Sequence, residues 1–205
     1  MTLDGFRPLA DRAVAPLVSA AKRAGLGPDT VSVLALLAAA GAAGSFAVAG
    51  DSRLAYLLGA VLVGCNGLLD VLDGILAREL DAASPAGDLL DHVLDRYADI
   101  AIVVGLAAGI GAFGLGLAAV TGVLMTSYLG TQTEAVGLDR VYGGLLGRAD
   151  RLVLVGAVTT VTGVVDVSVE GVSLVGWLLA VFAVVGHLTA VQRFYYARRD
   201  LRRAG

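Results

Sequence analysis

The stretches GLLDVLDGILAR (residues 67–78) and GDLLDHVLDR (residues 87–96) place four aspartates inside otherwise apolar sequence. Asp70 and Asp73 are three residues apart, and Asp91 and Asp95 are four apart. One aspartate near the centre of a membrane helix costs roughly 2.5–3.5 kcal/mol, so four would cost on the order of 10 kcal/mol without compensation. The pattern therefore predicts a partner for these carboxylates.

Positive charge is scarce around the four aspartates. No lysine lies between Asp70 and Asp95, and the nearby arginines are Arg78 and Arg96. The same stretch holds further acidic side chains, which are Glu79, Asp81 and Asp88. Two guanidinium groups cannot neutralise this set, so the simplest source of the missing charge is one divalent cation, or two.

The composition is that of a membrane protein. Of the 205 residues, 57% are hydrophobic and 16% are charged, with a mean hydropathy of +0.81. A typical soluble domain has about a quarter of its residues charged. Gly105 and Gly109 have the spacing at which transmembrane helices pack closely. The net charge of −3 gives no indication of nucleic-acid binding, and the single cysteine, Cys65, excludes an intramolecular disulfide.

Six apolar segments are each long enough to be a helix across a hydrocarbon core of about 30 Å, although the fifth is short. They are residues 30–50, 54–79, 87–110, 113–135, 151–167 and 172–196. Breaks with turn-forming residues lie at 50–52, 83–85, 143–144 and 166–171. We predict an all-α integral membrane protein with six transmembrane helices in one domain, residues 27–200.

Residues 1–26 are predicted to form an N-terminal amphipathic juxtamembrane helix. Apolar side chains recur there at helical spacing, and the charges occupy other positions. The apolar positions are Leu3, Phe6, Leu9, Ala10, Val14, Leu17, Val18 and Ala21. Such a helix either lies on the membrane surface or packs beside it against the protein, and both arrangements stay open.

The basic residues predict the orientation in the cell membrane. They precede the first helix, follow the last and occupy the turns after the second and fourth, whereas the opposite loops hold only Arg53. The clustered residues are Arg7, Arg12, Lys22, Arg23, Arg78, Arg140, Arg148, Arg151, Arg198, Arg199, Arg202 and Arg203. By the positive-inside rule, both termini and the aspartate-bearing helix ends are cytoplasmic.

The aspartate spacing points to a metal site. Residues three or four apart share a helix face, so Asp70 and Asp73 form one pair and Asp91 and Asp95 another. The short turn at residues 84–85 makes the two helices antiparallel neighbours, across which the pairs can converge. Oxygen ligands alone favour hard cations, so we expect these four residues to bind Mg²⁺ or Mn²⁺. His92 and His187 are expected to be packed or interfacial side chains.

Cations held by paired carboxylates suit phosphate and diphosphate substrates, whose charge they neutralise. Two other functions stay open. One is a cation transporter or channel, because intramembrane carboxylates also mark ion pathways, although those are usually spread through the membrane depth. The other is a membrane prenyltransferase with Asp-rich motifs, although Ala77 stands where that motif needs another acidic residue.

The pattern Asp70-x-x-Asp73-Gly74-x-x-Ala77-Arg78-x8-Gly87-x3-Asp91-x3-Asp95 resembles, without a gap, the signature of the CDP-alcohol phosphotransferases. The likeness extends to Gly27–Ser32, to Ser127-Tyr128 and to Glu134. It implies a six-helix catalytic domain, usually dimeric, with two metals in a polar cavity open to the cytoplasm. It also implies transfer of a substituted phosphate from a CDP-linked donor to an alcohol, with release of CMP.

The resemblance also implies roles for individual residues. Asp70, Asp73 and Asp91 would hold metal, and Asp95 would hold metal or accept the proton of the acceptor hydroxyl. The nucleotide and diphosphate site would be formed by Asp73, Gly74, Ala77, Arg78 and Gly87. Arg78 would meet the diphosphate, because a guanidinium matches phosphate oxygens.

Basic positions resemble the branch of the family that uses phosphorylated acceptors. Arg148, Arg151 and Arg193 are predicted to hold the acceptor phosphate, because arginines converging near a metal site suit a second anion. Relatives that use inositol phosphate often carry basic residues after the Ser-Tyr pair, where this chain has Leu129–Gln132. Glycerol phosphate and inositol phosphate therefore both stay open. The predicted enzyme makes phospholipid from CDP-diacylglycerol or CDP-archaeol, as a homodimer in the bilayer.

Overall fold

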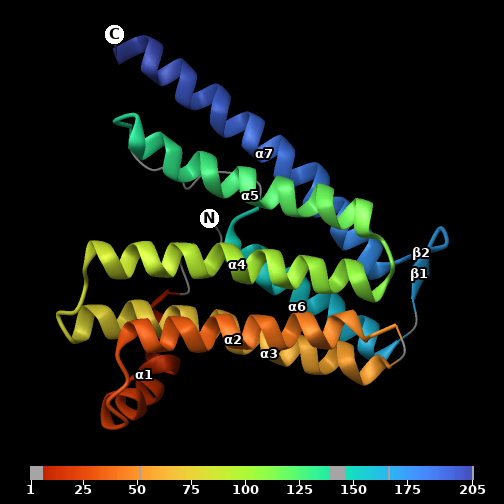
Figure 1. The fold of residues 1–205 in the computed structure, drawn as a ribbon, viewed down its shortest axis with the longest axis horizontal. Helices are drawn as coiled ribbons and strands as arrows, with labels where there is room; N and C mark the ends of the chain where they lie inside the picture. Colours follow the sequence, from red (N-terminus) through yellow and green to blue (C-terminus); the bar gives the residue numbers. More distant parts are fainter. Residues whose placement is uncertain (1–6, 51, 139–145, 166, 205) are drawn as a thin grey trace.

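The computed structural model describes residues 7–50, 52–138, 146–165 and 167–204, with the side chains of the first helix described from Val14 onward. The described chain is almost entirely helical, as Figure 1 shows. Its helices are α1 (Arg7–Arg23), α2 (Pro28–Ala47), α3 (Arg53–Glu79), α4 (Pro85–Gly109), α5 (Phe113–Ala135), α6 (Arg148–Val164) and α7 (Leu174–Ala204). A short hairpin, β1 (Ser168–Val169) and β2 (Val172–Ser173), is the one element here that the hydropathy pattern does not predict.

Four of the described helices, α2, α3, α5 and α7, are long and apolar enough to cross a membrane. The chain is thus a multi-pass membrane protein. Helix α4 has 25 residues but carries five charged side chains between Asp88 and Asp99, and α6 has only 17 residues. The prediction of six spans is therefore not confirmed by helix length and composition.

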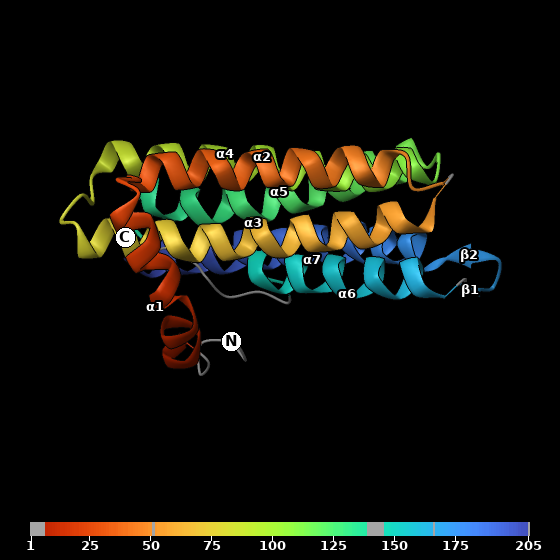
Figure 2. The same cartoon turned by 90° about the horizontal axis from the view of Figure 1, so that it is seen from below.

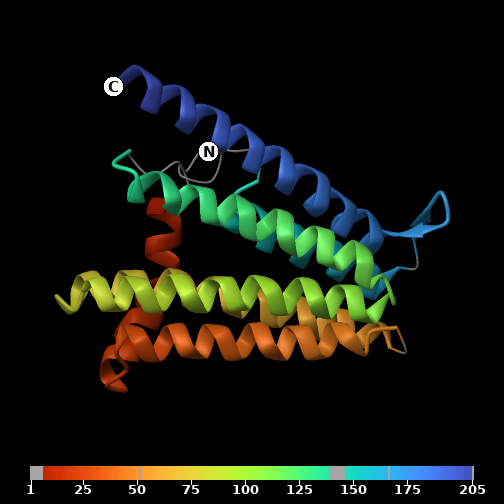
Figure 3. The same ribbon diagram turned by 45° about the horizontal axis from the view of Figure 1, so that its top comes forward.

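The helices form a bundle whose two parts separate toward one end. Helix α2 packs against both α3 and α4, α6 packs against α3, and α5 packs against α7. Figure 3 shows α5 and α7 diverging from α4 toward the end at which α1 and the C-terminus lie. Figure 2 shows the β1–β2 hairpin at the opposite end. The signature aspartates lie at the end where the bundle is open.

Close packing of α4 on α2 depends on Gly105 and Gly109, whose four-residue spacing predicts a helix-packing role. A Cβ atom at Gly105 would lie 2.4 Å from the carbonyl oxygen of Ala43, and one at Gly109 would lie 2.1 Å from that of Phe46. Both distances are shorter than any real Cβ contact, so only glycine allows the two backbones to touch. The predicted packing role of this pair is confirmed.

Helix α1 packs against the protein in its described part. Its buried side chains join a small apolar cluster with residues of α2 and α3, and Lys22 forms an ion pair with Glu79. The cluster consists of Val14, Val18, Ala21, Val31, Leu72 and Leu76. The side chains of Leu3, Phe6, Leu9 and Ala10, and the orientation residue Arg140, lie outside the described residues. The described contacts favour the arrangement in which the amphipathic helix packs against the protein.

Candidate active site

The turn between α3 and α4 positions the two halves of the signature, which are Asp70–Arg78 on α3 and Gly87–Asp95 on α4. The backbone N–H of Gly87 donates to the hydroxyl of Ser84 (3.1 Å), which caps α4, and Pro85 occupies the first turn of that helix. At the end of α3, Asp81 takes a positive φ of 49° and lets the chain reverse. The last turns of α3 and the first turns of α4 thus lie at the same end of the bundle.

Three of the four signature aspartates converge, as the sequence predicts. Asp70 of α3 and Asp91 and Asp95 of α4 each offer a carboxylate oxygen, and these oxygens all lie within 4.8 Å of one another. All three side chains are partly buried. An oxygen-only donor set of this size fits Mg²⁺ or Mn²⁺.

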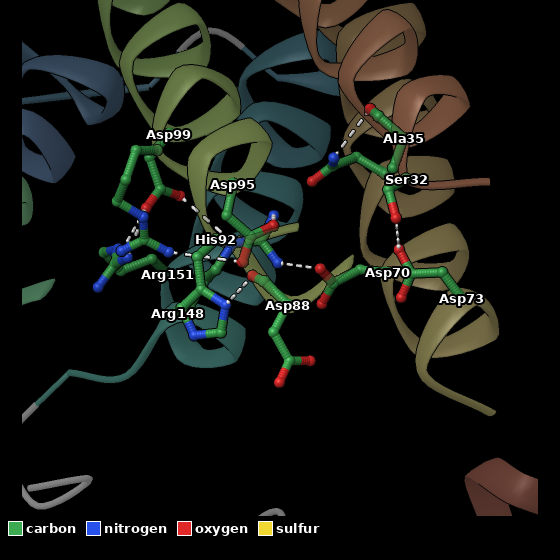
Figure 4. A network of polar contacts seen from close by, with 12 residues as sticks. Ser32, Ala35, Asp70, Asp73, Asp88, His92, Asp95, Asp99, Arg148 and Arg151 are labelled. Atoms are coloured by element: carbon green, nitrogen blue, oxygen red, sulfur yellow. Dashed lines mark hydrogen bonds and ion pairs between the residues drawn. The ribbon is translucent and has the colours of Figure 1, made fainter. Parts of the chain in front are cut away.

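Asp73 lies to one side of this group and is anchored by α2. It is buried, and its Oδ2 accepts a hydrogen bond of 2.7 Å from the Ser32 hydroxyl. Figure 4 shows this bond beside the inward-facing Asp70. A small cavity of about 70 Å³ opens at Asp73, and most of the predicted nucleotide-site residues line it. Its lining includes Asp29, Ser32, Asp73, Gly74, Ala77, Ser84, Gly87, Asp88 and Asp91.

Small residues and Arg78 complete the neighbourhood of the small cavity. A Cβ at Gly87 would lie 3.3 Å from the Ser84 hydroxyl and 3.5 Å from Asp29 Oδ1, so glycine keeps this corner open. Arg78 is exposed and does not line the cavity, but its Nη1 would lie 3.6 Å from a Cβ at Gly74. The guanidinium of Arg78 is thus beside the cavity rather than in its wall.

A larger cavity of about 1040 Å³ opens on the other side of α4, where α5 and α7 diverge. Asp95 and all three predicted acceptor arginines line it. Its polar lining includes Asp88, His92, Asp95, Arg96, Thr126, Ser127, Tyr128, Thr131, Glu134, Arg148, Arg151 and Arg193. The structure therefore brings the basic side chains of α6 and α7 to the same cavity as one signature aspartate.

The arginines are held by oxygen atoms around this cavity. Arg148 places Nη1 2.6 Å from Asp70 Oδ1 and Nη2 2.7 Å from Asp95 Oδ1, so it bridges the two halves of the signature (Figure 4). Arg193 donates to the backbone carbonyl of Thr126 at 2.6 Å. Arg151 donates to Asp99 at 2.8 Å.

Sequence reasoning assigned no role to two residues that contact charged side chains of the site, Ser32 and Asp99. Ser32 lies in the Gly27–Ser32 segment, but a serine near the start of a helix usually indicates only local capping, and its partner Asp73 is 41 residues away. Asp99 lies one helical turn beyond Asp95, so the four-residue spacing in the sequence already places it on the same helix face as Asp91 and Asp95. The histidines fit their expected roles, because His92 Nδ1 contacts the Asp88 carbonyl and His187 contacts Thr121.

Comparison with known proteins identifies the chain. Residues 26–185 match the family model described as CDP-alcohol phosphatidyltransferase. The chain belongs to this family. CDP-alcohol phosphatidyltransferases are the family predicted from the signature, so the activity class is a membrane transferase of phospholipid biosynthesis rather than an ion channel or a prenyltransferase.

Named relatives of this CDP-alcohol phosphatidyltransferase are similar over nearly the whole chain. The archaetidylinositol phosphate synthase of Methanothermobacter thermautotrophicus is 32% identical over 98% of this chain and 96% of its own length. The phosphatidylinositol phosphate synthase of Mycobacteroides abscessus is 34% identical over 89% of this chain and 82% of its own.

Solved structures agree with the fold. The Mycobacterium tuberculosis phosphatidylinositol phosphate synthase with CDP-DAG bound superposes with a TM-score of 0.77 at 28% identity, covering 91% of this chain and 94% of that one. The same enzyme in complex with manganese and citrate gives a TM-score of 0.76, covering 89% of this chain and 87% of that one.

Proposed function

We propose that this CDP-alcohol phosphatidyltransferase transfers the lipid phosphate of CDP-diacylglycerol or CDP-archaeol to a phosphorylated polyol and releases CMP. The observation that carries the proposal is the large cavity, whose wall combines Asp95 with Arg148, Arg151 and Arg193. Guanidinium groups match phosphate oxygens, so a cavity with several of them suits an anionic acceptor better than a neutral one. The names of the relatives favour inositol phosphate over glycerol phosphate as the acceptor.

In this proposal the nucleotide end of the donor binds at the small cavity, whose volume of about 70 Å³ takes only part of it. Asp73, Gly74, Ala77 and Gly87 line it and would contact the nucleotide, while Arg78 at its edge would bind the diphosphate. The CDP-DAG complex of the mycobacterial relative supports a CDP-linked lipid as donor. The absence of a Cβ at Gly74 and Gly87 leaves room for the donor between α3 and α4.

The four signature aspartates would bind divalent metal. Asp70, Asp91 and Asp95 already place oxygens within 4.8 Å of one another, and Asp73 would contribute from its position against Ser32. A bound divalent cation, or two, would neutralise the diphosphate and stabilise the departing CMP. The manganese complex of the relative supports Mg²⁺ or Mn²⁺ here.

Asp95 is the residue proposed to accept the proton of the acceptor hydroxyl. It is the signature aspartate that lines the large cavity, and its carboxylate also contacts Arg148. A hydroxyl becomes a competent nucleophile when a carboxylate within hydrogen-bond reach takes its proton during attack. Arg148, Arg151 and Arg193 would meanwhile hold the acceptor phosphate and turn the hydroxyl toward Asp95.

We also propose a six-span arrangement with both termini and the site at the cytoplasmic face of the cell membrane. The charged first half of α4 faces the two cavities, which would keep its carboxylates out of lipid. The basic last turns of α7 and the basic end of α1 support the orientation. A homodimer remains part of the proposal through the family resemblance.

The test is a reaction of the purified protein with a CDP-linked lipid, Mg²⁺ and a panel of acceptors, in which CMP and lipid product are both measured. Inositol phosphate and glycerol phosphate are compared with free inositol, glycerol and serine. The proposal expects CMP release with a phosphorylated polyol. Faster turnover of an unphosphorylated alcohol contradicts the acceptor class, and cation flux without CMP release contradicts the transferase altogether.

A further inference from the structure

Asp99 is a buried carboxylate that the proposed chemistry does not use. It lies on α4 one turn beyond Asp95, and only 6% of it is exposed to solvent. It is absent from the described lining of both cavities, so it is not placed to touch either substrate. A carboxylate buried in this way must be compensated by nearby positive charge.

Three arginines surround this carboxylate. Arg151 Nη2 lies 2.8 Å from Asp99 Oδ2, Arg96 Nη1 lies 3.7 Å from the same oxygen, and Arg148 Nε lies 3.7 Å from Oδ1. All three arginines line the large cavity, whereas Asp99 lies behind them. Figure 4 shows Asp99 above Arg151 and Arg148, on the side of the arginines away from Asp70.

We propose that Asp99 is a positioning residue that holds Arg96, Arg148 and Arg151 in the cavity wall, and so sets the preference for an anionic acceptor. The inference rests on the proposed function and adds Arg96 to the arginines on the acceptor side. A guanidinium has five N–H donors in a rigid fork, so the contact of Arg151 with Asp99 through Nη2 leaves further donors of Arg151 available for a phosphate. Arg148 meets Asp99 through Nε and is also held by Asp70 and Asp95 through its two Nη atoms.

Two physical effects give Asp99 this role. First, three guanidinium groups in one wall repel one another, and a central carboxylate offsets that repulsion before any acceptor binds. Second, an arginine side chain loses rotamer freedom when it binds a ligand, and prior fixation by Asp99 removes most of that cost from acceptor binding. A buried ion pair is weak evidence for stability, because apolar side chains of similar volume often stabilise a core as well. The Asp99–Arg151 pair is therefore better explained by the positions of the arginines than by folding.

The experiment compares Asp99→Asn with the wild type in the full-length membrane protein. The KM for inositol phosphate and the KM for the CDP-lipid are measured separately at saturating Mg²⁺. We expect the acceptor KM to rise about tenfold or more, the effect of losing one good charge-assisted contact, with the CDP-lipid KM within about twofold of wild type. Asp99→Glu, which keeps the charge but moves it, should give an intermediate acceptor KM. The matched control is Asp200→Asn, which removes the partner of Arg199 (3.0 Å) at the exposed end of α7 and should change neither KM.

The outcomes separate this inference from the proposed function. If the wild type releases no CMP with any phosphorylated polyol, the proposed function fails, whereas the Asp99 inference is judged only by the difference between variant and wild type. An unchanged acceptor KM in Asp99→Asn, or an equal rise in both KM values, overturns the inference. If Asp99→Asn does not fold, the double variant Asp99→Asn/Arg151→Gln removes both charges of the buried pair. A folded double variant with a wild-type acceptor KM would contradict both the positioning role of Asp99 and the acceptor role of Arg151, whereas a wild-type acceptor KM in Asp99→Glu would contradict positioning alone.

Discussion

Arg148 and Asp70 form an ion pair of 2.6 Å that joins the first turn of α6 to the signature helix α3. The same guanidinium also reaches Asp95 on α4 at 2.7 Å. The proposed acceptor arginines and the proposed metal-binding carboxylates thus form one connected network rather than two separate sites. A substitution on either side of this network should therefore alter binding on the other side.

Metal dependence is the first prediction. We expect chelation to abolish CMP release and Mg²⁺ or Mn²⁺ to restore it, because three carboxylates have oxygens within 4.8 Å of one another and the single guanidinium of Arg148, which contacts Asp70 and Asp95, offsets only part of their charge. Asp91→Asn and Asp73→Asn should lose most of the turnover, whereas Asp81→Asn, an exposed acidic residue in the adjoining turn, should not. Metal should also raise the thermal unfolding temperature of the wild type by mass action. Full activity in excess chelator would refute the assignment.

Asp95→Asn is expected to keep CDP-lipid binding and to lose turnover. A well-placed base contributes typically 10²–10⁴-fold to the rate, so the loss should lie in roughly that range. Donor binding is measured by isothermal titration with the CDP-lipid in detergent, and turnover by CMP release. Loss of donor binding in this variant would instead make Asp95 chiefly a metal ligand.

Removal of the acceptor arginines should raise the acceptor KM. A charge-assisted hydrogen bond is worth roughly 1.5–3 kcal/mol, so Arg193→Ala should weaken acceptor binding about tenfold or more with the CDP-lipid KM little changed. Arg148→Ala should do the same and should also alter the metal requirement, because Arg148 contacts Asp70 and Asp95. Lysine at either position should rescue only partly, since it lacks the planar fork.

The matched control for these variants is Arg202→Ala, in the exposed last turn of α7. If Arg148→Ala and Arg193→Ala behave like this control, with unchanged acceptor KM, these arginines are membrane anchors and the acceptor class is wrong.

Ser32→Ala tests the support of Asp73. The variant removes the hydroxyl that donates to Asp73 Oδ2 at 2.7 Å, which leaves a buried carboxylate oxygen without that partner. We expect donor or metal binding to weaken by several-fold to about tenfold. Weaker donor binding would raise the CDP-lipid KM, and weaker metal binding would raise the Mg²⁺ concentration needed for half-maximal activity. Ser45→Ala is the control, because Ser45 lies on the same helix and donates only to the carbonyl of Gly41 (2.9 Å). Equal effects in the two variants would argue against a specific role of Ser32.

Gly105→Ala should destabilise the fold. Its Cβ would lie 2.4 Å from the Ala43 carbonyl oxygen, so α2 and α4 must separate, which costs about 1–3 kcal/mol as overpacking does elsewhere. Gly64→Ala on α3 is the comparison, because a Cβ there meets nothing within 4 Å and alanine is the better helix former. Thermal unfolding in detergent should show a lower midpoint for the first variant and an equal or higher midpoint for the second. A midpoint at or above the wild type for Gly105→Ala would contradict the close backbone contact.

The helices themselves were predictable, because each is marked by local sequence. The expected segment 113–135 coincides with α5, and the segment 54–79 differs from α3 by one residue. Helix α6 begins at Arg148, three residues before the apolar run, since Asp150 accepts a hydrogen bond from the N–H of Gly147 (3.0 Å) and stabilises a polar first turn. Hydropathy alone cannot detect such a turn.

The site was predictable where one helix or one turn sets the geometry. The convergence of Asp70 with Asp91 and Asp95 follows from helical spacing and a short connection. The partners that come from distant helices were not predictable in this way. Arg148 contacts the aspartates only because α6 packs against α3, and Ser32 reaches Asp73 only because α2 packs against α3. Spacing within one segment carries no information about such contacts.

The two cavities lie on opposite sides of the first turns of α4, and Asp88 contributes to both walls. A molecule in one cavity does not displace a molecule in the other, so donor and acceptor can be bound at once in a ternary complex. The phosphorus could then be approached from the side opposite to the departing CMP, and no enzyme-bound phosphoryl group would be needed. Such a single displacement inverts the configuration at phosphorus, and its initial-rate plots intersect instead of running parallel.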